Sequence, residues 1–110
     1  MIDWQRVISL RNEIGEDDFA EIVPIFIEEV SEITEKIREN VTLGDLEDDL
    51  HCLKGSAVNL GFSEFADLCH KGESMAAKGA ADSVDVVAIL ASFDASRAAF
   101  LKGLEDGTAA

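Results

Sequence analysis

Apolar residues recur three and four positions apart along most of the chain, which is the spacing that one face of an α-helix produces. The sequence holds one proline and no tyrosine, and runs of β-branched residues are few, so little in the pattern favours β-strands. We therefore expect an all-α fold.

The first half of the chain predicts two helices. A short helix should begin after Asp3, a residue type that favours the N-cap position, and end at Gly15. A longer helix is expected from about Asp17 to about Asn40. Pro24 lies inside it and should bend it, because proline lacks a backbone donor and crowds the preceding turn.

The second half predicts three more helices. A third helix is expected between Thr42 and Gly61, and a fourth from Ser63, as its N-cap, to about residues 78–79. The short turn between them predicts a tight hairpin. The last helix should open near residues 82–83 and end before Gly107, where a tail of small residues is expected to fray.

Each predicted helix carries one apolar stripe that should face a shared core. The stripes are Val7, Leu10 and Ile14; Phe19, Ile22, Val23, Phe26, Val30, Ile33 and Ile37; Leu43, Leu46, Leu50, Leu53, Ala57 and Leu60; Phe65, Leu68, Cys69, Met75 and Ala76; and Val86, Ile89, Leu90, Phe93, Phe100 and Leu104. Short connections make successive helices antiparallel. The pattern thus predicts an antiparallel up-and-down four-helix bundle with a short N-terminal helix.

Length and charge narrow the class of protein. The 110 residues are the size of one domain, which we expect to span residues 1–110. Nine basic against 23 acidic residues give a formal charge of -14, which would repel nucleic acids and anionic lipids. We find neither a membrane-spanning run of apolar residues nor a signal peptide, and we expect a cytoplasmic protein. We also expect a monomer, and we expect Cys52 and Cys69 to be reduced.

The third predicted helix has a second stripe opposite its leucines, formed by His51, Lys54, Gly55 and Val58. A solvent-facing imidazole is mostly neutral at pH 7 and keeps a lone pair that can attack phosphorus. The ammonium of Lys54, one turn away, can offset the charge of a phosphoryl group. A glycine inside a helix costs about 1 kcal/mol relative to alanine, so Gly55 suggests either close approach of a phosphoryl group or partner, or loose packing between helices.

Of these residues, His51, Lys54 and Gly55 lie in the segment His51–Ala57 (HCLKGSA), which together with residues 59–62 (NLGF) resembles the signature of the histidine-containing phosphotransfer (HPt) domain family. The resemblance implies a helical bundle in which His51 is the phosphoacceptor, Lys54 its charge partner and Gly55 a position of steric access. It also implies that Glu73, on the next helix, hydrogen-bonds the imidazole and leaves one ring nitrogen free.

By the same resemblance, the chain is a phosphocarrier in a multistep phosphorelay and not an enzyme that binds ATP. His51 would accept a phosphoryl group from a receiver-domain aspartate and pass it to another. The implied partners are response-regulator receiver domains and hybrid sensor histidine kinases. The chain needs no cofactor of its own, since Mg²⁺ is expected in the receiver.

Two features bear on docking. Glu47, Asp48 and Asp49, just before His51, depart from the family pattern. Glu47 and Asp48, four and three residues before the histidine, would repel an incoming phosphoryl group but would steer a basic partner surface towards it. Val58 and Phe62 are candidates for an apolar docking patch.

Other functions have less support. The pairs His51-Cys52 and Cys69-His70 hold residue types that bind zinc, but adjacent helical residues point about 100° apart and fit one tetrahedral centre poorly. No calcium loop or phosphate-binding glycine loop is present. The alternative is a non-phosphorylated helical docking module for a signalling regulator, which substitution of His51 would leave unaffected.

Overall fold

The structure, a computed structural model, describes residues 2–105, which form five α-helices and one 3₁₀ turn. The elements are α1 (Trp4–Ile14), α2 (Glu16–Glu39), α3 (Leu43–Leu60), α4 (Ser63–Ala77), the turn η1 (Ala81–Ser83) and α5 (Val86–Glu105). An isolated antiparallel bridge joins Ile2 to Phe62, and no β-strand occurs in this part of the chain. The prediction of an all-α fold is confirmed.

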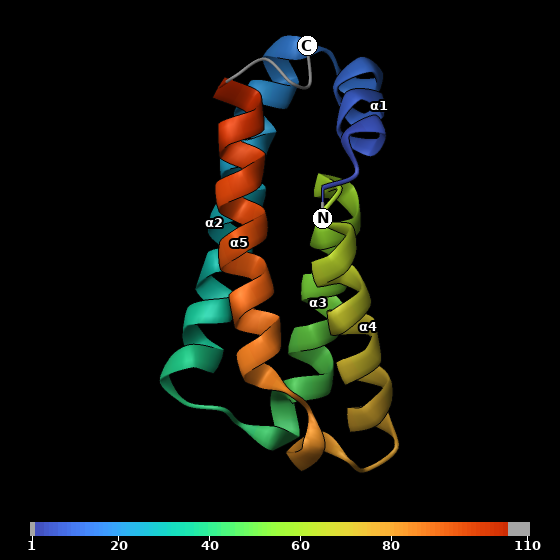
Figure 1. The fold of residues 1–110 in the computed structure, drawn as a ribbon, viewed down its shortest axis with the longest axis vertical. Helices are drawn as coiled ribbons and strands as arrows, with labels where there is room; N and C mark the ends of the chain where they lie inside the picture. Colours follow the sequence, from blue (N-terminus) through green and yellow to red (C-terminus); the bar gives the residue numbers. More distant parts are fainter. Residues whose placement is uncertain (1, 106–110) are drawn as a thin grey trace.

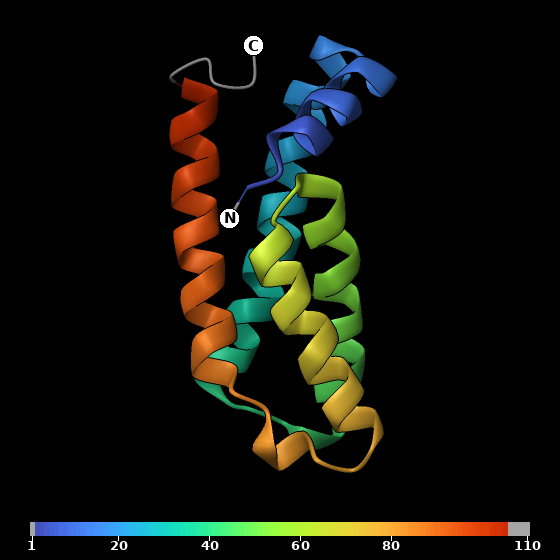
Figure 2. The same cartoon turned by 45° about the vertical axis from the view of Figure 1, so that its right-hand side comes forward.

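The four longer helices surround one core. Contacts join α2 to α3, α3 to α4, α4 to α5 and α5 back to α2, with the most extensive contacts in the α3–α4 hairpin. In Figures 1 and 2 these helices lie along the long axis of the molecule, and successive helices run in opposite directions. The short α1 packs against α2 and α3 at one end.

The predicted ends of the first two helices agree with the structure to within about one residue. Asp3 occupies the N-cap of α1, where its Oδ1 accepts a hydrogen bond from the Arg6 amide at 3.2 Å. Gly15, at φ 89°, separates α1 from α2. The α2 helix continues through Pro24, and a bend there stays a prediction.

The α3–α4 connection is as short as predicted because Gly61 adopts the left-handed conformation, with φ 75°. The Phe62 amide donates to the Ala57 carbonyl at 2.9 Å, and the Asp3 amide donates to the Gly61 carbonyl at 2.7 Å. Phe62, rather than Ser63 as predicted, occupies the N-cap position of α4. The turn is thus also the attachment point of the segment that leads into α1.

The predicted start of the last helix is wrong. Residues 82 and 83 lie in η1, and α5 begins at Val86. Asp85 caps α5, since its Oδ1 accepts a hydrogen bond from the Ala88 amide at 3.0 Å. Asp82, Ser83 and Asp85 are all residue types that can cap a helix, and because the first two lie in η1, the cap of α5 is Asp85. The tail around Gly107 lies outside the described residues.

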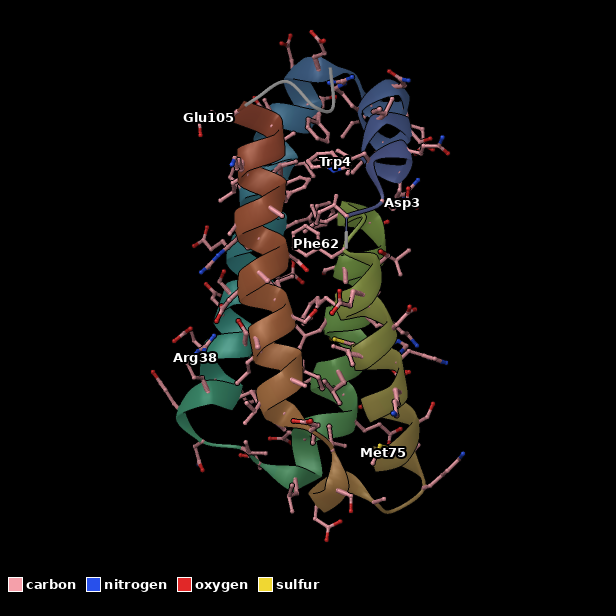
Figure 3. The ribbon with its side chains drawn as sticks, viewed as in Figure 1. Asp3, Trp4, Arg38, Phe62, Met75 and Glu105 are labelled. Carbon is pink, nitrogen blue, oxygen red and sulfur yellow. The ribbon has the colours of Figure 1, made fainter. Side chains whose placement is uncertain are left out.

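The predicted stripes supply most of the core, with two corrections. Leu43 was expected to face inward, but it is the first residue of α3 and is exposed. Phe62 was expected on a docking patch, yet it is fully buried, and its ring packs 5.3 Å from that of Phe100 and 6.4 Å from that of Phe93. Figure 3 shows Phe62 between the α3–α4 hairpin and α5.

No helix within residues 2–105 is both long enough and apolar enough to cross a membrane.

Candidate functional site

The site lies on the outward face of α3. Leu46, Leu50, Leu53, Ala57 and Leu60 are buried on the opposite side of this helix, so helical geometry turns His51 outward. The His51 side chain is 71% exposed. An imidazole at this position is open to a protein partner.

Glu73 of α4 joins His51 to Lys54. Its Oε2 lies 2.7 Å from His51 Nδ1, and its Oε1 accepts a hydrogen bond from Lys54 Nζ at 2.6 Å. The Glu73 side chain is only 15% exposed, which limits competition from water. One carboxylate therefore holds both the ring and the ammonium.

These contacts determine which groups of the cluster donate hydrogen bonds and which accept them. The hydrogen bond from Lys54, assisted by that of His51, lowers the pKa of Glu73 although partial burial opposes the shift. The carboxylate is therefore ionised at neutral pH and can only accept hydrogen bonds. Nδ1 of His51 must be the donor, so in the neutral ring the lone pair is on Nε2, for which residues 2–105 provide no hydrogen-bond partner.

Close packing of α4 on α3 brings Glu73 to the ring. Gly72 is buried, and a Cβ atom added there would lie 2.8 Å from Leu50 Cδ1 and 3.1 Å from Val84 Cγ1. A larger residue at this position would have to displace the Leu50 side chain and Val84, so glycine favours the close approach of α4 to α3. This role of Gly72 was not predicted from the sequence, although a glycine inside a predicted helix is a signal that could have suggested it.

Gly55 lies on the open side of the site. It is exposed, and a Cβ atom added there would meet no atom within 4 Å. Packing between helices therefore does not require this glycine. Of the two reasons considered for it, access for an incoming group is the one compatible with its surroundings.

Acidic side chains border the site on its N-terminal side. Glu47 and Asp48 are exposed, and neither forms an ion pair with any described residue. Asp49, by contrast, accepts hydrogen bonds from Lys36 Nζ at 3.1 and 3.3 Å, which raise the pKa of Lys36. The unpaired carboxylates are therefore available to a partner.

The cysteines do not belong to this cluster. Cys52 is exposed and Cys69 is buried, and both are free thiols. Burial, aided by the nearby charge of Glu73, raises the pKa of Cys69 to about 12. Within residues 2–105, no group of three or more His, Cys, Asp or Glu side chains is arranged to hold a metal ion.

Comparison with known proteins assigns the family. The model of the Hpt domain family matches residues 21–102, a segment that contains α3, α4 and the cluster of His51, Lys54 and Glu73 but not α1. The comparison with curated proteins gives no match, and the comparison with solved structures gives none. Because the family model covers well over half of the sequence, the chain belongs to the Hpt domain family.

Proposed function

We propose that this chain is a phosphocarrier that accepts a phosphoryl group on Nε2 of His51 from a receiver-domain aspartate and yields it to the aspartate of another receiver. Hpt domains act in histidine phosphotransfer within phosphorelays. The observation that carries the proposal is the exposed ring, which is held at Nδ1 by an ionised carboxylate and is free at Nε2.

The transfer step uses that arrangement. Nε2 attacks phosphorus, the N–P bond forms as the bond from phosphorus to the aspartyl oxygen breaks, and the receiver recovers its free carboxylate. The ring becomes positively charged as the new bond forms, while its proton stays on Nδ1, shared with Glu73. In the return step, a receiver carboxylate attacks phosphorus and the neutral imidazole leaves.

Lys54 offsets the negative charge that arrives with the phosphoryl group. In the structure its ammonium is bound to Glu73, the same carboxylate that holds the ring, so it lies beside the reacting residue. A lysine stem is flexible, and rotation about its bonds would let Nζ contact the phosphoryl oxygens. Gly55 leaves the approach to the ring open.

Mg²⁺ in the partner receiver would neutralise charge during transfer, and the chain itself would supply the nucleophile, its orientation and a docking surface. We further propose that residues 1–110 act as one domain, an antiparallel four-helix bundle preceded by α1. The alternating helix directions and the ring of helix contacts support this arrangement. We also propose that the chain is a monomer and that it acts in the cytoplasm, a reducing compartment with which the two free cysteines agree.

The test compares wild type with His51→Gln, using His70→Gln as the control because His70 is also exposed. Each protein is incubated with a phosphorylated receiver and Mg²⁺, and acid-labile phosphate on this chain is measured. We expect labelling of wild type and of His70→Gln only. Equal binding of all three proteins to the receiver without labelling would instead support a non-phosphorylated docking module.

A further inference from the structure

A pocket of about 250 Å³ opens where the segment leading into α1 meets the α3–α4 hairpin. Its walls include Asp3 and Arg6, Ala57 and Val58 of α3, and Ala66 and Asp67 of α4. Val58 is 53% exposed, so apolar surface at the wall of this pocket is open to a partner. We call this feature the α1–α3–α4 pocket.

The pocket is preformed. The amide of Asp3 donates to the Gly61 carbonyl at 2.7 Å, and Ile2 pairs with Phe62, so the start of α1 is fixed to the α3–α4 turn. A Cβ atom on Gly61 would lie 2.6 Å from the Asp3 carbonyl oxygen, which shows how closely the two segments pack. Figure 3 shows Asp3 at the foot of α1, next to this turn.

The polar groups on the α1 side of the pocket already form hydrogen bonds or ion pairs within the protein. Arg6 Nη2 donates to Asn59 Oδ1 at 3.3 Å, its Nη1 lies 3.6 Å from Glu13 Oε1, and Asp3 Oδ1 accepts from the Arg6 amide. The methyl groups of Val58, Ala57 and Ala66 have no such partners. The opening therefore suits an apolar side chain, and because a cavity of about 150 Å³ can hold benzene, one aromatic or branched aliphatic side chain fits its volume.

The position of the pocket relative to His51 identifies the occupant. Val58 follows His51 by seven residues, so it lies about two helical turns, roughly 10.5 Å, along the same face of α3. A specific interface covers about 800 Å² on each partner, which as a disc has a radius of about 16 Å. A receiver whose aspartate reaches Nε2 of His51 would therefore cover the pocket as well.

We propose that the α1–α3–α4 pocket binds an apolar side chain of the docking receiver domain. We further propose that the α1 wall of the pocket, formed by Asp3 and Arg6, determines which receivers bind. This inference rests on the proposed phosphocarrier function. The outward face of α3 indicates the chemistry of the partner. The receiver should present an apolar side chain to the pocket and basic side chains to the unpaired Glu47 and Asp48, which lie towards the other end of α3. The α1 wall lies outside residues 21–102, the segment that the family model matches, so it is a feature of this chain on which partner choice can depend.

The first test places a charge in the pocket with Val58→Asp. The matched control is Val87→Asp, because Val87 lies on α5, away from the pocket, and is 78% exposed. The second-order rate constant for transfer from a phosphorylated receiver is measured for both variants and wild type. Phosphoramidate, a small donor that needs no docking, reports the reactivity of His51 itself, and circular dichroism checks the fold.

We expect Val58→Asp to reduce the rate constant for transfer from the receiver at least tenfold, although phosphoramidate still labels this variant. Val87→Asp should change neither the transfer rate nor the labelling rate by more than twofold. If Val58→Asp accepts phosphate from the receiver as fast as wild type, the pocket inference is wrong and the phosphocarrier function stands. If phosphoramidate labels wild type but no receiver does, the phosphocarrier proposal fails and the inference fails with it.

The second test concerns the α1 wall. Arg6→Ser should change the ratio of the transfer rate constants for two different receivers by at least threefold, because each receiver presents its own side chain to the altered wall. The Val87→Asp control should leave that ratio unchanged. An unchanged ratio in Arg6→Ser would overturn the role of α1 in selection.

Discussion

Glu73→Gln isolates the effect of the carboxylate charge on His51, because glutamine has the same shape and keeps one carbonyl acceptor. Glu73 holds Nδ1 at 2.7 Å and Lys54 Nζ at 2.6 Å, and the lowered pKa of Glu73 keeps it charged at neutral pH. In the proposed transfer, positive charge develops on the ring as Nε2 attacks phosphorus. The carboxylate should stabilise that charge more than an amide can.

The size of the effect follows from the hydrogen bond. Hydrogen bonds to charged groups contribute about 1.5–3 kcal/mol, and a neutral acceptor is roughly half as strong, so the loss is about 0.7–1.5 kcal/mol. The lower part of that range is favoured because the ring is 71% exposed and water screens the interaction. A barrier higher by this amount slows phosphorylation by about three- to tenfold.

The assay is the rate of His51 labelling by phosphoramidate at pH 7, followed by phosphorus-31 NMR. Glu64→Gln is the control, because Glu64 is an exposed residue of α4 outside the cluster. Nitrogen-15 NMR of the imidazole should also show Nδ1 protonated in wild type and a mixture of tautomers in Glu73→Gln. Labelling of Glu73→Gln at the wild-type rate, with an unchanged tautomer, would refute the role of Glu73.

Other expectations follow from the same structure. Because the pKa of Glu73 is lower in the folded protein than its ordinary value of 4.5, its ionised carboxylate stabilises the fold above pH 4.5, and this contribution is lost as the pH falls through the pKa of the folded state. In urea unfolding at pH 7, wild type should therefore have a higher free energy of unfolding than Glu73→Gln, and the difference should shrink in acid. Gly61→Ala should lower the free energy of unfolding by about 1–3 kcal/mol, since φ is 75° and the new Cβ would meet the Asp3 carbonyl; an unchanged value would contradict the close packing. Gly55→Ala, by contrast, should raise the free energy of unfolding by up to about 1 kcal/mol while slowing transfer from a receiver, and faster transfer would argue against an access role. Iodoacetamide at pH 8 should label Cys52 in the native protein and Cys69 only after unfolding, because burial raises the pKa of Cys69 to about 12; mass spectrometry of the native protein would reveal any exception.

The sequence was most informative where the structure depends on local spacing. The leucine stripe of α3 predicted which side of the helix is buried, and so predicted the outward direction of His51. Residues with strong end preferences, such as Asp3 and Gly61, placed helix ends to within about one residue. The buried side of a helix and the positions of its ends depend on residues that are close together in the sequence, so they can be predicted from the sequence pattern alone.

The sequence was least informative where contacts join separate elements. Phe62 was placed on the surface, because the pattern does not show that α5 brings Phe93 and Phe100 over the α3–α4 turn. The sharing of Glu73 between His51 and Lys54 depends on the close approach of two helices, which the buried Gly72 favours. Resemblance suggested that Glu73 lies near the ring, but only the structure shows that Lys54 binds the same carboxylate.

The most direct test of the central claim identifies the atom of this chain that carries the phosphoryl group after incubation with a phosphorylated receiver and Mg²⁺. Nitrogen-15 and phosphorus-31 NMR of the labelled protein distinguish the two ring nitrogens. The arrangement at Glu73 predicts one phosphoryl group, on Nε2 of His51, with the proton retained on Nδ1. Phosphate on Nδ1 or on any other residue, or none from a receiver that binds the chain, would contradict the account.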